Sequence, residues 1–435
     1  MNKNVTDKNV ENNGGIRIKR LADIHSDKAV QNGAFAIHPG PRCPLALVTN
    51  VITGIQGACA LIVGMAECTY YNRNISLALH KETGTNHTWS YSLASNEVIF
   101  GCREGVMQAL EQIDRDGAEA IFLVSACVPE LIGEDFEGMA REANSRLKAR
   151  VIHIHAAHFR CFSSVPAREE SLTSLHQLME KQEVRAKTVN LLGEGARWVG
   201  KSELVCLLRK QGVHINCSIP GNLTVEEIRK ASSAALSIVV DMAALPLAQK
   251  MQESFGTPFV LFPHLLDVEE IRSTYREIGA HLQVDLEKEI EVLYADAKKQ
   301  MEIHVEKVKG KSFACGYLEI DSFICSAFLS SLGMNPAYLE IEYFFEKARQ
   351  WSGKVLADGH NPYIGRTFTF NTTRQVLRDL FPDYFLGHAM QKQAKTGALP
   401  YVKCEGAGSL LGFEQPLHLL EALAAASQTT EQLKT

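Results

Sequence analysis

The sequence predicts an α/β protein made of three successive Rossmann-like domains, each with a doubly wound parallel sheet. Short apolar runs alternate with longer amphipathic segments along most of the chain, a pattern typical of parallel strands joined by helices. The pattern restarts after a charged stretch at residues 168–185 and again after a long charged segment at residues 285–307. Three cysteines also stand at or near the ends of apolar runs, where the strands of such a sheet pass into loops.

The first domain is expected to cover residues 31–185, after a polar tail at residues 1–30 that we expect to be mobile until a partner orders it. Its predicted strands are residues 58–63, 120–124 and 151–155, and its predicted helices are residues 106–113 and a segment from 129 through 143. The charged stretch at residues 168–185 is taken as the boundary to the next domain.

The second domain is expected at residues 186–284, and the third at residues 285–435 together with a bridging helix and a polar C-terminal tail. In the second, strands are predicted at residues 188–192, 213–215, 235–240 and 259–261, and helices at 203–211, from 225, and at 247–255. The bridging helix at residues 285–307 contains no Gly or Pro. In the third, strands are predicted at residues 312–317, 338–341, 354–356, 384–386 and 400–402.

Composition narrows the functional class. A chain of 435 residues can hold two or three domains, and 46% apolar with 22% charged residues is typical of a soluble globular protein. The net charge of −5 and the lack of a Lys/Arg cluster argue against a nucleic-acid surface. No apolar run is long enough to span a membrane, and the first residues lack the apolar segment of a secretion signal. We therefore expect a cytoplasmic protein.

The three cysteines are Cys43 in Pro-Arg-Cys-Pro, Cys68 in Ala-Glu-Cys-Thr and Cys127 in Ser-Ala-Cys-Val-Pro-Glu. The chain has eleven cysteines, but their scattered positions do not form a small disulfide framework. Thiolates that converge in a protein that is not secreted are more often iron–sulfur or zinc ligands than disulfide partners. We therefore predict that these three cysteines meet at one sheet edge and bind a metal cofactor.

Three segments carry a resemblance to a known family. Residues 127–137 read Cys-Val-Pro-Glu-Leu-Ile-Gly-Glu-Asp-Phe-Glu, which resembles the Cys-x-x-x-x-Ile-Gly-Asp-Asp segment of the nitrogenase component 1 family. Residues 96–101 are similar to that family's strand-to-turn segment, which usually ends in Gly-Gly. Residues 408–423, with Leu-Gly-Phe-Glu from 411, are similar to its Gly-Tyr-Glu-Gly segment at the start of a C-terminal helix. The resemblance covers roughly residues 33–425.

Two further features refine the resemblance. The three cysteines are spaced 25 and 59 positions apart, which is closer to the β-type chains of the family than to the α-type chains. Ala157-His158-Phe159 is also similar to a segment of the β-type chains. In α-type catalytic chains a cofactor-binding cysteine follows a strand of the second domain, where this sequence has Asp241. The resemblance therefore implies that this chain holds no nitrogenase-type cofactor in its own core.

The resemblance implies a β-type subunit of a nitrogenase-like reductase. Cys43, Cys68 and Cys127 would hold an iron–sulfur cluster, a 4Fe-4S or an 8Fe P-cluster-like one, shared with an α-like component 1 subunit in a heterodimer or an α2β2 heterotetramer. The cluster would relay electrons from an ATP-dependent iron–sulfur reductase homodimer to a substrate site mainly in the α-like subunit. No catalytic residue of this chain is implied. The alternative is a non-catalytic scaffold for assembly of an iron–sulfur cofactor, and the substrate stays open.

The sequence departs from the family pattern in two places. The family's His-Gly-Pro-x-Gly-Cys loop reads Val-Gly-Met-Ala-Glu-Cys from residue 63 to Cys68, so we expect a different turn or a smaller cluster. Cys102 replaces the second Gly of the Gly-Gly turn and is a spare thiol near the predicted site. Cys161, Cys102 and the partner subunit all stay open as sources of a fourth ligand.

Three histidines and one helix lie near the predicted site. His153 and His155 share one face of their strand, and His158 follows the strand end. A zinc site would need a carboxylate or thiolate to complete the set, and only Cys161 is nearby in sequence. We therefore interpret these histidines as ordinary buried or loop residues, with a role toward substrate or partner left open.

The helix after Cys127 is expected to bury Val128, Leu131 and Ile132.

A rival interpretation is a P-loop NTPase. The segment from Gly195 to Ser202 satisfies the pattern G-x-x-x-x-G-K-[ST], and the strand ending at Asp241 would supply the Mg²⁺-organising carboxylate. Bulky side chains at residues 197–199 would hinder close approach of phosphates to the backbone. The segment also follows a complete domain that a simple NTPase does not explain. We therefore interpret it as a chance match on a strand–turn–helix.

Overall fold

The computed structural model describes residues 17–33, 43–70, 88–160, 163, 165–197, 199–318, 320–366, 370–388, 392, 399–404 and 406–432. The chain divides into two compact units. We call residues 39–197 and 212–261 the cysteine unit, and residues 1–38, 198–211 and 262–435 the C-terminal unit. Within the described residues, no helix has the length and apolar character that crossing a membrane requires.

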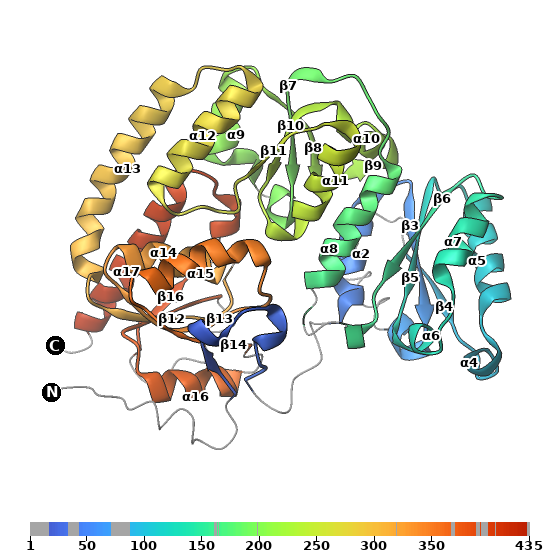
Figure 1. Cartoon of the computed structure of the whole chain (residues 1–435), viewed down its shortest axis with the longest axis horizontal. Helices are drawn as coiled ribbons and strands as arrows, with labels where there is room; N and C mark the ends of the chain where they lie inside the picture. Colours follow the sequence, from blue (N-terminus) through green and yellow to red (C-terminus); the bar gives the residue numbers. More distant parts are fainter. Residues whose placement is uncertain are drawn as a thin grey trace. The chain divides into compact units, whose positions relative to one another are not determined.

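The first sheet of the cysteine unit is parallel, in the order β4-β3-β5-β6. Its strands are β3 (Ala58–Gly64), β4 (Thr88–Ser92), β5 (Ala120–Ser125) and β6 (Arg150–His155). Helices α5 (Arg103–Arg115) and α7 (Phe136–Asn144) lie on one side of this sheet, and α2 (Pro44–Ile52) and α8 (Val165–Ser174) lie on the other (Figure 1). Every residue of β5 is buried because both faces of this central strand are covered.

The second sheet of the cysteine unit is also parallel, in the order β11-β10-β7-β8. Its strands are β7 (Arg185–Leu192), β8 (His214–Ile219), β10 (Ala234–Val239) and β11 (Phe259–Leu261). Helices α10 (Val225–Arg229) and α11 (Leu245–Phe255) accompany it. The charged stretch expected to separate two domains overlaps α8, which contacts α2 and β6 as well as α11. The helix therefore belongs to both halves of the unit.

The C-terminal unit contains a six-stranded sheet in the order β1-β14-β13-β12-β15-β16, in which only β1 is antiparallel to its neighbour. The strands are β1 (Lys19–Arg20), β12 (Ser312–Cys315), β13 (Asn335–Glu340), β14 (Tyr363–Gly365), β15 (Tyr384–Gly387) and β16 (Tyr401–Lys403). The helices are α9 (Glu203–Lys210), α12 (Val268–Leu282), α13 (Glu287–Val308), α14 (Ser322–Ser331), α15 (Arg349–Ala357), α16 (Phe370–Leu380) and α17 (Glu414–Gln432).

The predicted fold class is confirmed, since the described residues form an α/β structure with three main sheets that are almost wholly parallel. The strand predicted at residues 354–356 is wrong. These residues lie in α15, where Trp351 and Val355 are buried at a helical spacing of four. The strand at that side of the sheet is β14, whose three residues form too short a run to stand out from sequence alone.

Two other expectations also fail locally. Residues 96–101 form the short helix α4 (Glu97–Phe100) and a turn, where a strand was expected. The Glu97 carboxylate accepts a hydrogen bond from the Ala94 backbone at 2.7 Å, which fixes the start of this helix. Residues 17–33, mostly within the expected tail, add β1 to the sheet, and the fully buried Arg366 forms an ion pair with Asp27. Intramolecular contacts therefore order this part of the chain.

Candidate functional site

The carboxyl end of β3 packs closely against Ala126, the residue that follows β5. β3 ends at Gly64, and residues 66–70 are helical, so Cys68 lies in the first turn of a helix. A Cβ atom on Gly64 would lie 2.8 Å from the Cβ of Ala126 and 3.2 Å from the Cβ of Cys68. Only glycine therefore lets the strand end, Cys68 and the residue before Cys127 come this close.

The structure brings Cys68 and Cys127 into one neighbourhood. Both thiols are half-buried. Burial raises the pKa of Cys68, and the nearby thiol of Cys127 raises it further. The backbone N–H of His158 donates a hydrogen bond to the Cys127 sulfur at 3.2 Å. Two thiolates held together repel each other unless a positive charge compensates them, so this arrangement suits a shared cationic group.

Cys43 stands at the N-cap of α2, directly before Pro44. Its thiol is half-buried. Helix α2 contacts β3, and so does the short helix α6 (Cys127–Leu131) that begins with Cys127. All three predicted ligands therefore lie in the cysteine unit, on elements that contact β3 or continue from it. Cys161, which was left open as a fourth ligand, lies outside the described residues.

Cys102 is a core residue. Its side chain is 1% exposed, and its backbone N–H donates to Glu134 Oε1 at 2.7 Å. Burial and the carboxylates of Glu134 and Glu97 raise the pKa of its thiol to about 12. The preceding Gly101 has φ +92° and faces Glu134 closely, whereas Cys102 has φ −112°. The turn therefore requires the first glycine of the family pattern and tolerates a side chain at the second position.

Large apolar side chains are exposed on α4 and on α6, the helix that begins with Cys127, and directly after it. We call Ile99, Phe100, Leu131 and Ile132 the apolar rim; their exposed fractions are 75%, 85%, 67% and 39%. Its α4 and α6 sides are joined because Glu134, which follows α6, binds the backbone of Cys102, which follows α4. The expectation that Leu131 and Ile132 are buried is wrong. Helix α6 is a single turn that ends before Gly133 at φ +81°, and it buries only Pro129 among its residues.

A second cluster lies beside Cys127. Ser125 Oγ donates to Glu130 Oε1 at 2.6 Å and lies 2.8 Å from His153 Nε2. His155 Nδ1 lies 3.3 Å from the same Glu130 oxygen. The ligand atoms of Glu130, His153 and His155 all lie within 4.8 Å of one another.

The histidine pair shares a face of its strand, as the sequence predicts, but Glu130 completes the set that we expected to remain open. Glu130 was missed because it is 23 positions away from His153 in sequence. The parallel register of β5 and β6, with Ser125 opposite His155, carries the two segments to the same edge. A sequence search for a carboxylate just after the neighbouring strand would have found it.

Asp241 has a structural role at the end of β10. Its carboxylate accepts hydrogen bonds from the backbone N–H of Ala243 at 2.9 Å and of Glu194 at 3.2 Å, and Arg168 lies 3.9 Å away. The described part of the segment that matches the rival P-loop pattern contains two short 3-10 turns, η6 (Glu194–Arg197) and η7 (Val199–Lys201). Because the Asp241 carboxylate already binds backbone amides, nothing in this region favours a Mg²⁺–nucleotide site.

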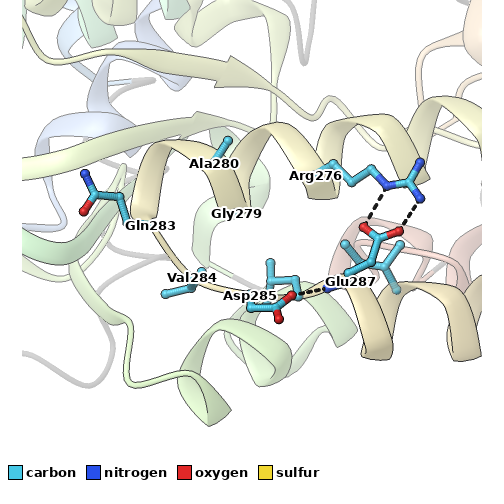
Figure 2. A pocket seen from close by; sticks show the side chains of 9 residues that line it. Arg276, Gly279, Ala280, Gln283, Val284, Asp285 and Glu287 are labelled. Carbon is cyan, nitrogen blue, oxygen red and sulfur yellow. Dashed lines mark hydrogen bonds and ion pairs between the residues drawn. The ribbon is translucent and has the colours of Figure 1, made fainter.

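Figure 2 shows a hollow at the turn between α12 and α13. Its charged groups satisfy one another, since Arg276 forms an ion pair with Glu287 and Asp285 accepts the backbone N–H of Glu287 at 3.1 Å. Neither cysteine nor histidine lines it. This hollow therefore offers no ligand for a metal or an iron–sulfur cluster.

Comparisons with known proteins agree that this chain is similar to nitrogenase-related proteins. A family model for nitrogenase component 1 type oxidoreductases matches residues 43–427. The nitrogenase iron-molybdenum cofactor biosynthesis protein NifE of Clostridium pasteurianum is 24% identical over 383 residues, covering 82% of this chain and 80% of that protein. The nitrogenase molybdenum-iron protein alpha chain of Methanosarcina barkeri is 24% identical over 294 residues, covering 62% of this chain and 54% of that protein. A solved structure, Nitrogenase Cp1 at pH 6.5, covers 93% of this chain and 96% of that chain, with a TM-score of 0.75 and 15% identity.

Proposed function

Because the chain belongs to the nitrogenase component 1 type oxidoreductase family, we propose that it is the cluster-carrying subunit of a nitrogenase-like complex. In this proposal Cys43, Cys68 and Cys127 are its ligands to an iron–sulfur cluster that it shares with a partner subunit. The observation that carries the proposal is the pairing of two half-buried thiols at one sheet edge, with exposed apolar side chains on the helix that begins with Cys127.

The residues at this edge fit such a cluster. Thiolates are the ligands that iron–sulfur clusters require, and N–H donors to the sulfur tune the cluster. His158 supplies one such donor to Cys127, and Gly64 keeps Cys68 close to the exit of β5. When bound, the cluster would supply one-electron chemistry. We infer that the role of this chain is to position the cluster. We assign no residue of this chain to proton transfer.

The apolar rim supports a partner subunit. Monomeric proteins rarely leave clustered large apolar side chains in water, and such patches mark interaction sites. Ile99, Phe100 and Leu131 each expose at least two-thirds of their surface. Three ligands from one chain also leave a four-iron cluster one ligand short. We propose that an α-like subunit covers the rim and completes the cluster, in a heterodimer or an α2β2 heterotetramer.

Two roles follow from this arrangement. As a β-type reductase subunit, the chain would relay electrons from an ATP-dependent iron–sulfur reductase to a substrate site mainly in its partner. As a scaffold, it would hold a cofactor or its precursor for transfer without turnover. The scaffold role is favoured by the relatives, because several of those matched are cofactor biosynthesis proteins named NifE. Both roles share the cysteine ligands.

The first experiment tests the cluster. Anaerobic purification of the chain with its bound partners should yield brown protein that contains iron and acid-labile sulfide. Cys127→Ala should lose most of the iron, because one thiolate and its N–H···S contact are removed. Cys206→Ala is the matched control, since Cys206 is an exposed thiol on α9. Iron-free wild-type complex, or full iron content in the Cys127 variant, would contradict the proposal.

A second experiment separates the two roles. The isolated complex is mixed with an ATP-dependent iron–sulfur reductase and candidate substrates, and in parallel with an apo-enzyme that lacks its cofactor. Substrate turnover that needs ATP supports the reductase role. Activation of the apo-enzyme without turnover supports the scaffold role.

A further inference from the structure

Beyond the proposed cysteine cluster, we propose a second, independent metal site formed by Glu130, His153 and His155. It would bind a single divalent transition-metal ion of the Zn²⁺ class. Two elements supply the ligands: β6 carries both histidines, and α6, which follows β5, carries Glu130. Within the described residues, this is the one set of three such side chains whose ligand atoms converge.

The spacing of the ligand atoms suits one ion. Zinc binds His nitrogen and carboxylate oxygen at about 2.0–2.2 Å, so two ligands of a tetrahedral centre lie about 3.4 Å apart. His155 Nδ1 and Glu130 Oε1 are already 3.3 Å apart. The complete set of ligand atoms lies within 4.8 Å, so small side-chain rotations bring the third ligand to the same distance.

The hydrogen bonds around the cluster are those of a prepared site. His155 Nδ1 is buried and makes no hydrogen bond, although Glu130 Oε1 is near it. A cation bound to both atoms would give each of them a partner. Ser125 donates to Glu130, which orients the carboxylate in the way that outer hydrogen bonds orient metal ligands.

Charge favours a cation here. The Glu130 side chain is only 2% exposed, and a carboxylate attracts a bound cation more strongly in such a low-dielectric environment than in water. Two imidazoles and a carboxylate match the His₂Glu sets that bind zinc with one position left open for water or another ligand. A bound ion would also link β6 to α6, the helix that begins with Cys127.

The test is metal binding by the full chain prepared without oxygen. Equilibrium dialysis and calorimetry with Zn²⁺ should give one site per chain that persists in the Cys127→Ala variant, which separates this site from the cysteine cluster. Glu130→Gln and His155→Gln should each weaken it by at least about 100-fold, because each removes a direct ligand. His214→Gln is the matched control, an exposed histidine at the start of β8 and outside the set, and should leave affinity unchanged.

The site is overturned by no Zn²⁺ binding in the Cys127→Ala background, or by equal affinity in the His155→Gln and His214→Gln variants. A spectrum of Co²⁺ bound to the unaltered chain does not depend on the folding of any variant. Nitrogen and oxygen coordination without a cobalt–thiolate band supports the site. A thiolate band at the first equivalent places the ion on the cysteines and overturns it.

Discussion

The two segments that most strongly carry the family resemblance use their residues in opposite ways. In the C-terminal unit, Phe413 is 1% exposed and packs edge-on against Tyr275. Glu203 Oε1 accepts hydrogen bonds from the Tyr275 hydroxyl at 2.8 Å and from the Phe413 backbone at 3.0 Å. Glu414 Oε1 in turn accepts from the backbone of Glu203 at 3.0 Å. Phe413 and Glu414 therefore bind partners within the C-terminal unit.

The cysteine segment leaves several of its side chains accessible to solvent. Cys127 is half-buried, and Leu131 and Ile132 of the apolar rim face solvent. A motif can therefore persist for two physical reasons: closed packing that the fold needs, or exposed chemistry that a ligand or partner completes. Resemblance alone does not separate the two, but burial and hydrogen-bond satisfaction do.

The largest effect on stability is expected in the closed segment, at Gly412. A Cβ atom there would lie 2.1 Å from the Tyr275 hydroxyl and 2.4 Å from Glu203 Oε1, and the backbone has φ +129°. Gly412→Ala should therefore lower the free energy of unfolding by about 3–5 kcal/mol, from backbone strain and overpacking together. Urea denaturation of the isolated chain measures it.

Gly353→Ala provides the control for this prediction. Gly353 lies inside α15, and a Cβ added there would meet nothing within 4 Å, so alanine should stabilise the helix by about 0.5–1 kcal/mol. If Gly412→Ala unfolds at the same urea concentration as the control, the closed packing of this segment is looser than the contacts indicate.

A smaller effect on stability, with a functional readout, is expected at Gly64. Alanine would place its Cβ 2.8 Å from that of Ala126, and relieving the overlap should cost about 1–3 kcal/mol. The shift separates Cys68 from Cys127, so iron content should fall although both thiols remain. Iron analysis beside urea denaturation measures both effects. Normal iron at reduced stability would show that cluster binding does not depend on this close approach.

Sequence periodicity was sufficient for most of the fold. Strands such as β3 and β5 are continuous apolar runs, which is how strands buried on both faces of a parallel sheet commonly appear in a sequence. The strand predicted at residues 354–356 failed because three residues of α15 are too few to separate a period of two from one of 3.6. β14 was missed for the same reason, since only three residues form it.

The candidate site was only partly predictable. Cys68 and Cys127 could be paired because the carboxyl ends of neighbouring parallel strands meet at one edge. The exposure of Leu131 could not be predicted, because the apolar pattern after Cys127 also fits a buried helix. What decides it is Gly133, which ends α6 after one turn. Glu130 was missed because its neighbours His153 and His155 are close in space and distant in sequence.

The smallest effect on stability is expected at the open segment, where Ile132 is 39% exposed. Ile132→Glu should change the free energy of unfolding of the isolated chain by no more than about 0.5 kcal/mol, as for other surface substitutions. It should weaken partner association by at least about tenfold, because a charge at the core of an apolar interface is left without solvent. Sedimentation of the anaerobic complex measures association, and calorimetric melting of the isolated chain measures stability.

Ile303→Glu is the matched control for this prediction. Ile303 lies on α13 and is 55% exposed, so the same charge enters water there and both measurements should stay at wild-type values. A large loss of stability at Ile132 would mean that α6 packs internally as the sequence pattern first indicated. Unchanged association at Ile132 would remove this residue from the proposed interface, because a partner that covered it would have to accommodate a buried carboxylate.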